Sequence, residues 1–221
     1  LKYARQDIAF LKQYDVKAVV VACGTVSTTA ISQVREEYDF PLIGVVEPSA
    51  AKAVKVTKNG KIGLIGTIAS IRSGKYEQEI KKLMPEAQIF TKACPLFVPL
   101  VENGRINSGD VVIETVAREY LQSVKDFGVD TLILGCTHYP LISDIVGDIM
   151  GPEVTLVDSG AETAEYTAAV LGELGLLTGR QEEGSREYCV TDSVDGFSGL
   201  ASMFLGSDSP CSVRKVSIDN L

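Results

Sequence analysis

The sequence contains one histidine, His138, among 221 residues, and its five cysteines form no C-x-x-C pair. A single histidine cannot supply the usual histidine-rich metal sites, and an odd cysteine count argues against a zinc ribbon or a disulfide scaffold. We therefore expect no metal and no other cofactor. Free thiols indicate a reducing compartment such as the cytoplasm.

Long apolar runs and basic clusters are also missing from the sequence. No run is long enough to span a membrane, and no signal peptide is recognisable. Twenty-one basic residues face 29 acidic ones, which gives a net charge of −8 and no basic stripe to neutralise phosphates. We expect neither a membrane nor a nucleic acid as a partner.

The residues that are present favour a globular α/β protein. Hydrophobic residues make up 45% of the chain and charged residues 23%, enough to build one large core or two smaller ones. Predicted strands alternate with predicted helices, the signature of a parallel α/β sheet. We expect strands at 16–22, 41–46, 61–66, 88–91, 129–134, 154–157, 186–191 and 215–218. We expect helices at 1–14, 27–38, 49–55, 68–83, 110–127, 139–149, 161–174 and 194–204, and a proline-punctuated loop at 94–104.

The stretch from Leu132 to Leu141 organises the chain. It begins as a buried strand and ends on Gly135, Cys136, Thr137 and His138. In open α/β sheets, ligands bind at the carboxyl ends of the strands, so these side chains are candidates for a site. The competing interpretation is that Cys136 packs as a small hydrophobic residue, since free cysteines are among the most buried residues.

A second segment repeats this pattern. Residues 19–25 form an apolar strand that ends on Cys23 and Thr25, as residues 132–138 end on Cys136 and its polar neighbours. Two facing thiols could form a disulfide, hold a metal, or act as acid and base on opposite faces of one carbon. The last role needs one thiolate at neutral pH. Because the ordinary thiol pKa is about 8.5, one site must stabilise the thiolate form. The remaining cysteines, Cys94, Cys189 and Cys211, are predicted to be structural.

At this point the motifs resemble those of a known family. Residues 135–141 are similar to the second cysteine motif of glutamate racemases, and residues 22–27 to the first. Further similar motifs follow in the family order at 44–48, 65–67, 94–102 and 157–160. His138 strengthens the resemblance, since the related aspartate racemases carry a glutamate at that position.

The resemblance implies a cofactor-independent isomerase that interconverts L- and D-glutamate and supplies D-glutamate for peptidoglycan. It implies two pseudo-symmetric parallel-sheet α/β domains with the active site between them. The first domain would comprise residues 1–45 and 159–221, and the second residues 46–158. A homodimer is also expected.

The resemblance further implies roles for individual residues. Cys23 would act on the α-proton of the D-enantiomer and Cys136 on that of the L-enantiomer, with His138 assisting Cys136. The substrate would be bound by residues around both thiols, namely Gly24, Thr25, Thr67, Thr137 and Glu102.

The sequence departs from the family pattern in two ways. The family's opening Asp-Ser-Gly strand end and Pro-Tyr-Gly loop do not occur before Cys23, and the Asp-Ser-Gly at 158–160 is a different motif. We therefore expect an incomplete first domain whose strand at 16–22 has an unpaired edge or an exposed apolar face. The second departure is Gly24, where the family usually has asparagine.

Two alternatives remain open from the sequence. One is a racemase or epimerase that uses the same thiol pair on another amino acid. The other is a catalytically inactive binding or regulatory relative that retains the cleft.

Overall fold

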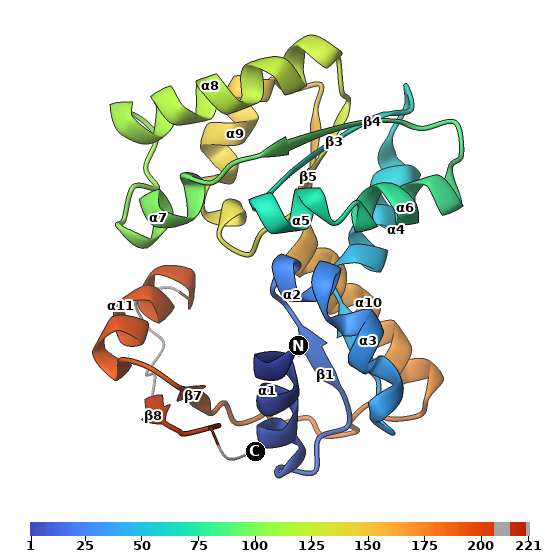
Figure 1. Cartoon of the computed structure of the whole chain (residues 1–221), viewed down its shortest axis with the longest axis vertical. Coiled ribbons are helices and arrows are strands. Elements are labelled where there is room, and N and C mark those ends of the chain that lie inside the picture. Colours follow the sequence, from blue (N-terminus) through green and yellow to red (C-terminus); the bar gives the residue numbers. More distant parts are fainter. Residues whose placement is uncertain (206–212, 220–221) are drawn as a thin grey trace.

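The computed structural model describes residues 1–205 and 213–219 and contains three parallel sheets. A four-stranded sheet of order β4-β3-β5-β6 forms the centre of a large lobe, and the two-stranded sheet β1-β2 lies in a small lobe (Figure 1). The third sheet, β7-β8, follows near the C-terminus. The predicted parallel α/β fold class is confirmed.

The strands within the described residues are β1 Val19–Val21, β2 Leu42–Gly44, β3 Lys61–Gly66, β4 Gln88–Ala93, β5 Thr131–Leu134, β6 Thr155–Asp158, β7 Tyr188–Val190 and β8 Val213–Lys215. The helices within the same residues are α1 Lys2–Lys12, α2 Gly24–Thr29, α3 Ile31–Val34, α4 Val46–Val56, α5 Ile68–Arg72, α6 Lys75–Leu83, α7 Phe97–Glu102, α8 Val111–Phe127, α9 Ser143–Met150, α10 Ser159–Glu173 and α11 Val194–Leu205. Two short 3-10 turns, Arg35–Glu37 and Tyr139–Ile142, complete the set.

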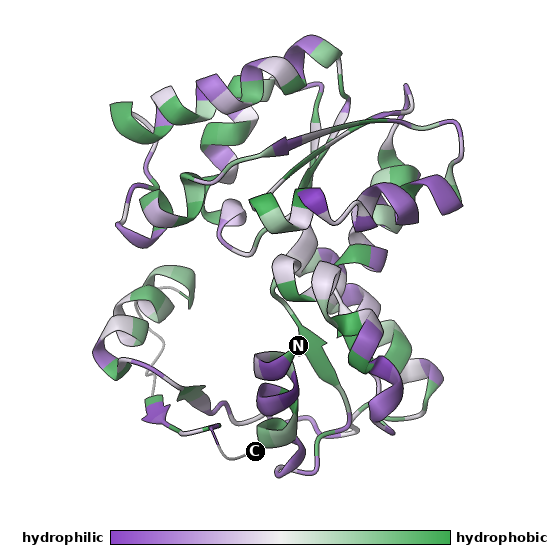
Figure 2. Cartoon of the chain, in the orientation of Figure 1, coloured by the Kyte–Doolittle hydropathy of each residue, from purple (hydrophilic) through white to green (hydrophobic). Residues whose placement is uncertain are grey.

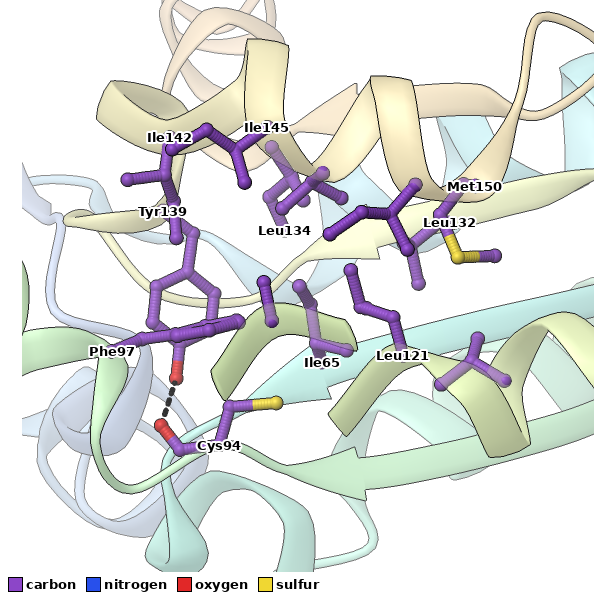
Figure 3. Close-up of a cluster of buried hydrophobic side chains, with 14 of the residues drawn as sticks. Ile65, Cys94, Phe97, Leu121, Leu132, Leu134, Tyr139, Ile142, Ile145 and Met150 are labelled. Atoms are coloured by element: carbon purple, nitrogen blue, oxygen red, sulfur yellow. Dashed lines mark hydrogen bonds between the residues drawn. The ribbon is translucent and has the colours of Figure 1, made fainter. Parts of the chain in front are cut away.

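The four-stranded sheet is covered by helices on both faces. Successive side chains of a strand point to opposite faces, and on β5 Leu132 and Leu134 pack with α8 and α9, whereas Ile133 packs with α4 and α6. Figure 3 shows the first of these clusters, in which the Tyr139 hydroxyl donates to the Cys94 carbonyl at 3.0 Å. Burial on both faces explains the mostly apolar sequences of the two central strands, β3 and β5.

The small lobe has a thinner core. Side chains of α1, α3 and the two strands form it, namely Ile8, Val19, Ile31, Val34 and Leu42. Among the described residues β1 pairs only with β2. Its apolar residue Val20 is 43% exposed, and β1 is hydrophobic along its length (Figure 2). Within the part of the chain that the structure describes, β1 therefore has the predicted unpaired edge.

The described part of the C-terminal segment, residues 186–205 and 213–219, contacts the small lobe. Tyr14, two residues after the end of α1, hydrogen-bonds Glu187 and Arg214, and Phe10 and Tyr14 line a pocket with Tyr188 and Phe197. The domain limits at residues 45 and 158 stay a prediction. No helix within the described residues is long and apolar enough to cross a membrane.

Several predicted elements were wrong in detail. The strand expected at 215–218 is β8 at Val213–Lys215, and the helix expected at 139–149 begins with a 3-10 turn before α9. The helix expected at 68–83 breaks into α5 and α6 at Gly74, whose φ of +63° suits glycine. The helix expected at 27–38 is likewise divided and begins earlier, at Gly24. The expected loop 94–104 contains helix α7. Pro99 does not prevent this helix, because it lies in the first turn, where a backbone N–H would have no helical acceptor.

Candidate active site

The two lobes meet where two glycines touch. Gly24 begins α2 just after β1, and Gly135 follows β5. A Cβ atom at Gly24 would lie 2.5 Å from the Gly135 carbonyl oxygen, and one at Gly135 would lie 2.8 Å from the Ile65 carbonyl oxygen. Both positions therefore need glycine, since the obstacle in each case is backbone. The contact brings the two cysteine motifs to one place.

A chain of hydroxyl groups crosses the same contact. Thr25 Oγ1 lies 2.8 Å from Thr67 Oγ1, and the Thr67 hydroxyl lies 3.0 Å from Ser70 Oγ. Thr67 also caps α5 by accepting from the Ser70 backbone N–H at 3.2 Å. Thr25 comes from the small lobe and Thr67 from the large one, so this bond joins the lobes.

His138 lies at the centre of a second polar cluster. Its Nε2 atom lies 3.1 Å from Glu102 Oε1, while its Nδ1 atom lies 3.8 Å from Cys136 Sγ and 3.4 Å from Thr137 Oγ1. A carboxylate can only accept a hydrogen bond, so in the neutral imidazole this pair puts the proton on Nε2. The Nδ1 lone pair then faces Cys136.

The two thiols differ in environment. Cys23 precedes α2 and is exposed, whereas Cys136 is buried at 7% exposure against the core of the large lobe. Burial raises the pKa of Cys136. A hydrogen bond from the His138 backbone N–H lowers that pKa, a Cys23 thiolate raises it, and a hydrogen bond from the Thr137 side chain lowers it. Both cysteines are free thiols. Within the described residues, no three acidic, cysteine or histidine side chains are grouped to hold a metal.

Comparison with known proteins identifies the family. A model of the family described as Asp/Glu/Hydantoin racemase matches residues 2–167, more than half of the chain. The chain belongs to this racemase family. The glutamate racemase of Geobacter metallireducens is 43% identical over 205 residues, which cover 93% of this chain and 75% of that protein. The resemblance inferred from the cysteine motifs is confirmed.

Solved structures of glutamate racemases share the fold of this racemase chain. The RacE1 isoform from Bacillus anthracis superposes with a TM-score of 0.92 at 34% identity, covering 98% of this chain and 79% of that one. The Francisella tularensis enzyme, solved in complex with D-glutamate, gives a TM-score of 0.88 at 31% identity, covering 100% of this chain and 81% of that one. These likenesses support the two-lobed arrangement.

The sequence motifs did not single out two residues at this site. Ser70 is fully buried and extends the hydroxyl chain, and Phe204 of α11 packs against the His138 ring. Ser70 follows Thr67 by three residues, the spacing of a helix cap, and that spacing could have pointed to it. Nothing in the local sequence around Phe204 indicates its contact.

Proposed function

We propose that this protein interconverts L- and D-glutamate without a cofactor, using Cys23 and Cys136 as a pair of proton-transfer groups. The observation that carries the proposal is the Gly24–Gly135 contact, because Gly24 directly follows Cys23 and Gly135 directly precedes Cys136, so the contact brings the two cysteine motifs together from different lobes. Membership of the racemase family and the similarity to glutamate racemases support the choice of substrate. We further propose that the enzyme works in the cytoplasm, supplies D-glutamate for peptidoglycan and forms a homodimer.

In the direction from D- to L-glutamate, the exposed thiol of Cys23 acts as the base. Its thiolate removes the α-proton, and the Cys136 thiol delivers a proton to the opposite face of the same carbon. The raised pKa of buried Cys136 favours its protonated form before this step. One proton leaves the substrate and one enters it, so the enzyme ends with Cys23 protonated and Cys136 as the thiolate.

In the opposite direction, Cys136 must first lose its proton. The Nδ1 atom of His138 lies 3.8 Å from Cys136 Sγ and can accept this proton. Glu102 then stabilises the imidazolium through Nε2, at 3.1 Å. This cluster resembles other nucleophile–base–carboxylate arrangements in which the third group orients the base.

The substrate itself would be held by short polar groups. We assign the hydroxyls of Thr25, Thr67 and Thr137 to the carboxylate and amino groups of glutamate. At Gly24 only a backbone N–H is offered, because the Gly135 carbonyl leaves no space for a side chain.

Solvent exchange at the α-carbon tests the proposal. Incubation with L-glutamate in D₂O should replace the α-proton with deuterium, as followed by proton NMR, and should produce D-glutamate, as followed by circular dichroism. Cys189→Ser is the matched control, since Cys189 is a partly exposed thiol at β7 outside the two motifs, and it should retain activity.

Three outcomes would contradict the proposal. The first is exchange with another amino acid, such as aspartate, but not with glutamate, which would favour a racemase of different specificity. The second is glutamate binding without exchange, which would favour an inactive binding relative. The third is activity that depends on added pyridoxal phosphate, which would overturn the two-thiol chemistry.

A further inference from the structure

A phenylalanine from the C-terminal segment contacts the histidine of the large lobe. The rings of Phe204 and His138 lie 5.5 Å apart between centroids and are inclined by 86°, an edge-to-face arrangement. Phe204 belongs to α11, in the segment that also packs on α1 of the small lobe. This contact therefore joins the small-lobe side of the molecule to a group at the proposed site.

The polar partners of His138 do not fix its ring firmly. The contacts of Nδ1 with Cys136 Sγ at 3.8 Å and with Thr137 Oγ1 at 3.4 Å are both long. The closer partner, Glu102, has a side chain that is 43% exposed, so water and salt screen its charge. All three lie near ring nitrogens, and they leave the rotation of the ring weakly constrained.

Phe204 supplies a contact of a different kind. Edge-to-face aromatic pairs have a preferred geometry and contribute beyond the area they bury. Phe204 is itself 39% exposed, so its ring is not needed to fill the core of either lobe. Burial alone therefore does not explain why the Phe204 ring lies against the His138 ring.

We propose that Phe204 is a positioning residue that holds the His138 imidazole with Nδ1 directed at Cys136. This inference rests on the proposed function only in assigning His138 to proton transfer. Because Phe204 lies on α11, the placement of the C-terminal segment controls the proton transfer that uses Cys136. The transfer that uses Cys23 does not involve His138 and is independent of Phe204.

His138 is the only histidine in the chain, so its imidazole NMR signals are assigned without ambiguity. We would compare Phe204→Leu, which removes the ring but keeps an apolar side chain, with Phe204→Tyr, which keeps the ring. Leu205→Ala, at the neighbouring and 49% exposed position of α11, is the matched control. In Phe204→Leu, loss of the ring current should shift the imidazole proton signals, whereas the other two variants should retain the wild-type shifts.

A partial reaction then separates the two proton transfers. In a Cys23→Ser background, elimination of chloride from a β-chloro analogue of L-glutamate needs only Cys136 as the base. Phe204→Leu should slow this elimination roughly 3- to 10-fold, the range expected for one aromatic pair. In a Cys136→Ser background, elimination from the D-analogue should not change, and Phe204→Tyr should restore the L-reaction.

Two results would overturn the proposal. One is an unchanged imidazole spectrum in Phe204→Leu, and the other is an equal loss in both eliminations, which would indicate a general structural role. The spectrum requires no turnover. A chain that lacks racemase activity but shows the predicted shifts would refute the proposed function and still support the positioning contact.

Discussion

The two thiol residues differ in exposure and in neighbours, and this difference belongs to the scale of single residues. Cys136 is buried beside His138, whereas Cys23 is exposed at the start of α2. In the proposed mechanism each thiol serves one direction of abstraction, so Cys23→Ser and Cys136→Ser should both abolish racemisation, since a hydroxyl is a far weaker acid–base partner at neutral pH. Each variant should still eliminate chloride from one analogue: Cys136→Ser from the D-form and Cys23→Ser from the L-form. Measured elimination by both variants from the same enantiomer would disprove the assignment of faces.

At the scale of elements, the start of α2 lies directly against the end of β5. Gly24→Ala places a Cβ atom 2.5 Å from the Gly135 carbonyl oxygen, so the two lobes must move apart. This movement should break the Thr25–Thr67 hydrogen bond of 2.8 Å and misplace one thiol relative to the substrate. Misplacement by about 1 Å can cost roughly 100-fold in rate, and we expect kcat/KM for glutamate to fall by about that amount.

A glycine elsewhere in the chain serves as the control for this change. A Cβ atom added at Gly147 of α9 would have its nearest neighbour, Leu156 Cδ1, at 3.8 Å, which is an ordinary contact. Gly147→Ala should leave kcat/KM unchanged and should raise the free energy of unfolding by about 0.5–1 kcal/mol, since alanine favours a helix interior. Equal activity of both alanine variants would show that the lobes do not need this close approach.

At the scale of the whole molecule, buried thiols make stability depend on alkaline pH. Burial raises the pKa of Cys94 to about 12, and burial also raises the pKa of Cys136. In the unfolded chain a thiol ionises at about pH 8.5, so the unfolded state loses its proton first as the pH rises. The stabilising effect is complete below about pH 8.5 and is lost as the pH rises towards the folded-state value, by at most ~1.4 kcal/mol per pH unit for each thiol.

Urea unfolding at pH 7.5, 8.5 and 9.5 measures this loss. Cys94→Ala should reduce the decline in the free energy of unfolding across this range. The decline that remains in this variant should come from Cys136. Cys189→Ala removes a partly exposed thiol and should keep the wild-type slope. A slope in Cys94→Ala identical to that of the wild type would contradict the role of thiol burial.

Most elements, and the residues proposed for the site, could be predicted from the sequence because their signals are local. The apolar stretches at residues 62–66 and 132–134 specify β3 and β5, since both faces of the large sheet are covered. The two cysteine motifs follow their strands directly, and the carboxyl ends of strands are where an α/β sheet offers a site. The helix breaks and α7 were less predictable, because Gly74 and Pro99 are compatible with several local structures.

Only the tertiary structure decided how the two motifs meet. The Gly24–Gly135 contact, the Thr25–Thr67 bond and the Phe204–His138 pair each join residues far apart in the chain. Such contacts depend on how the lobes pack, and periodicity along one segment carries no information about its partner in another. The sequence by itself therefore determined the chemical groups and the strands that present them. Packing determined which group faces which, because distance and orientation between two lobes arise only when both have folded.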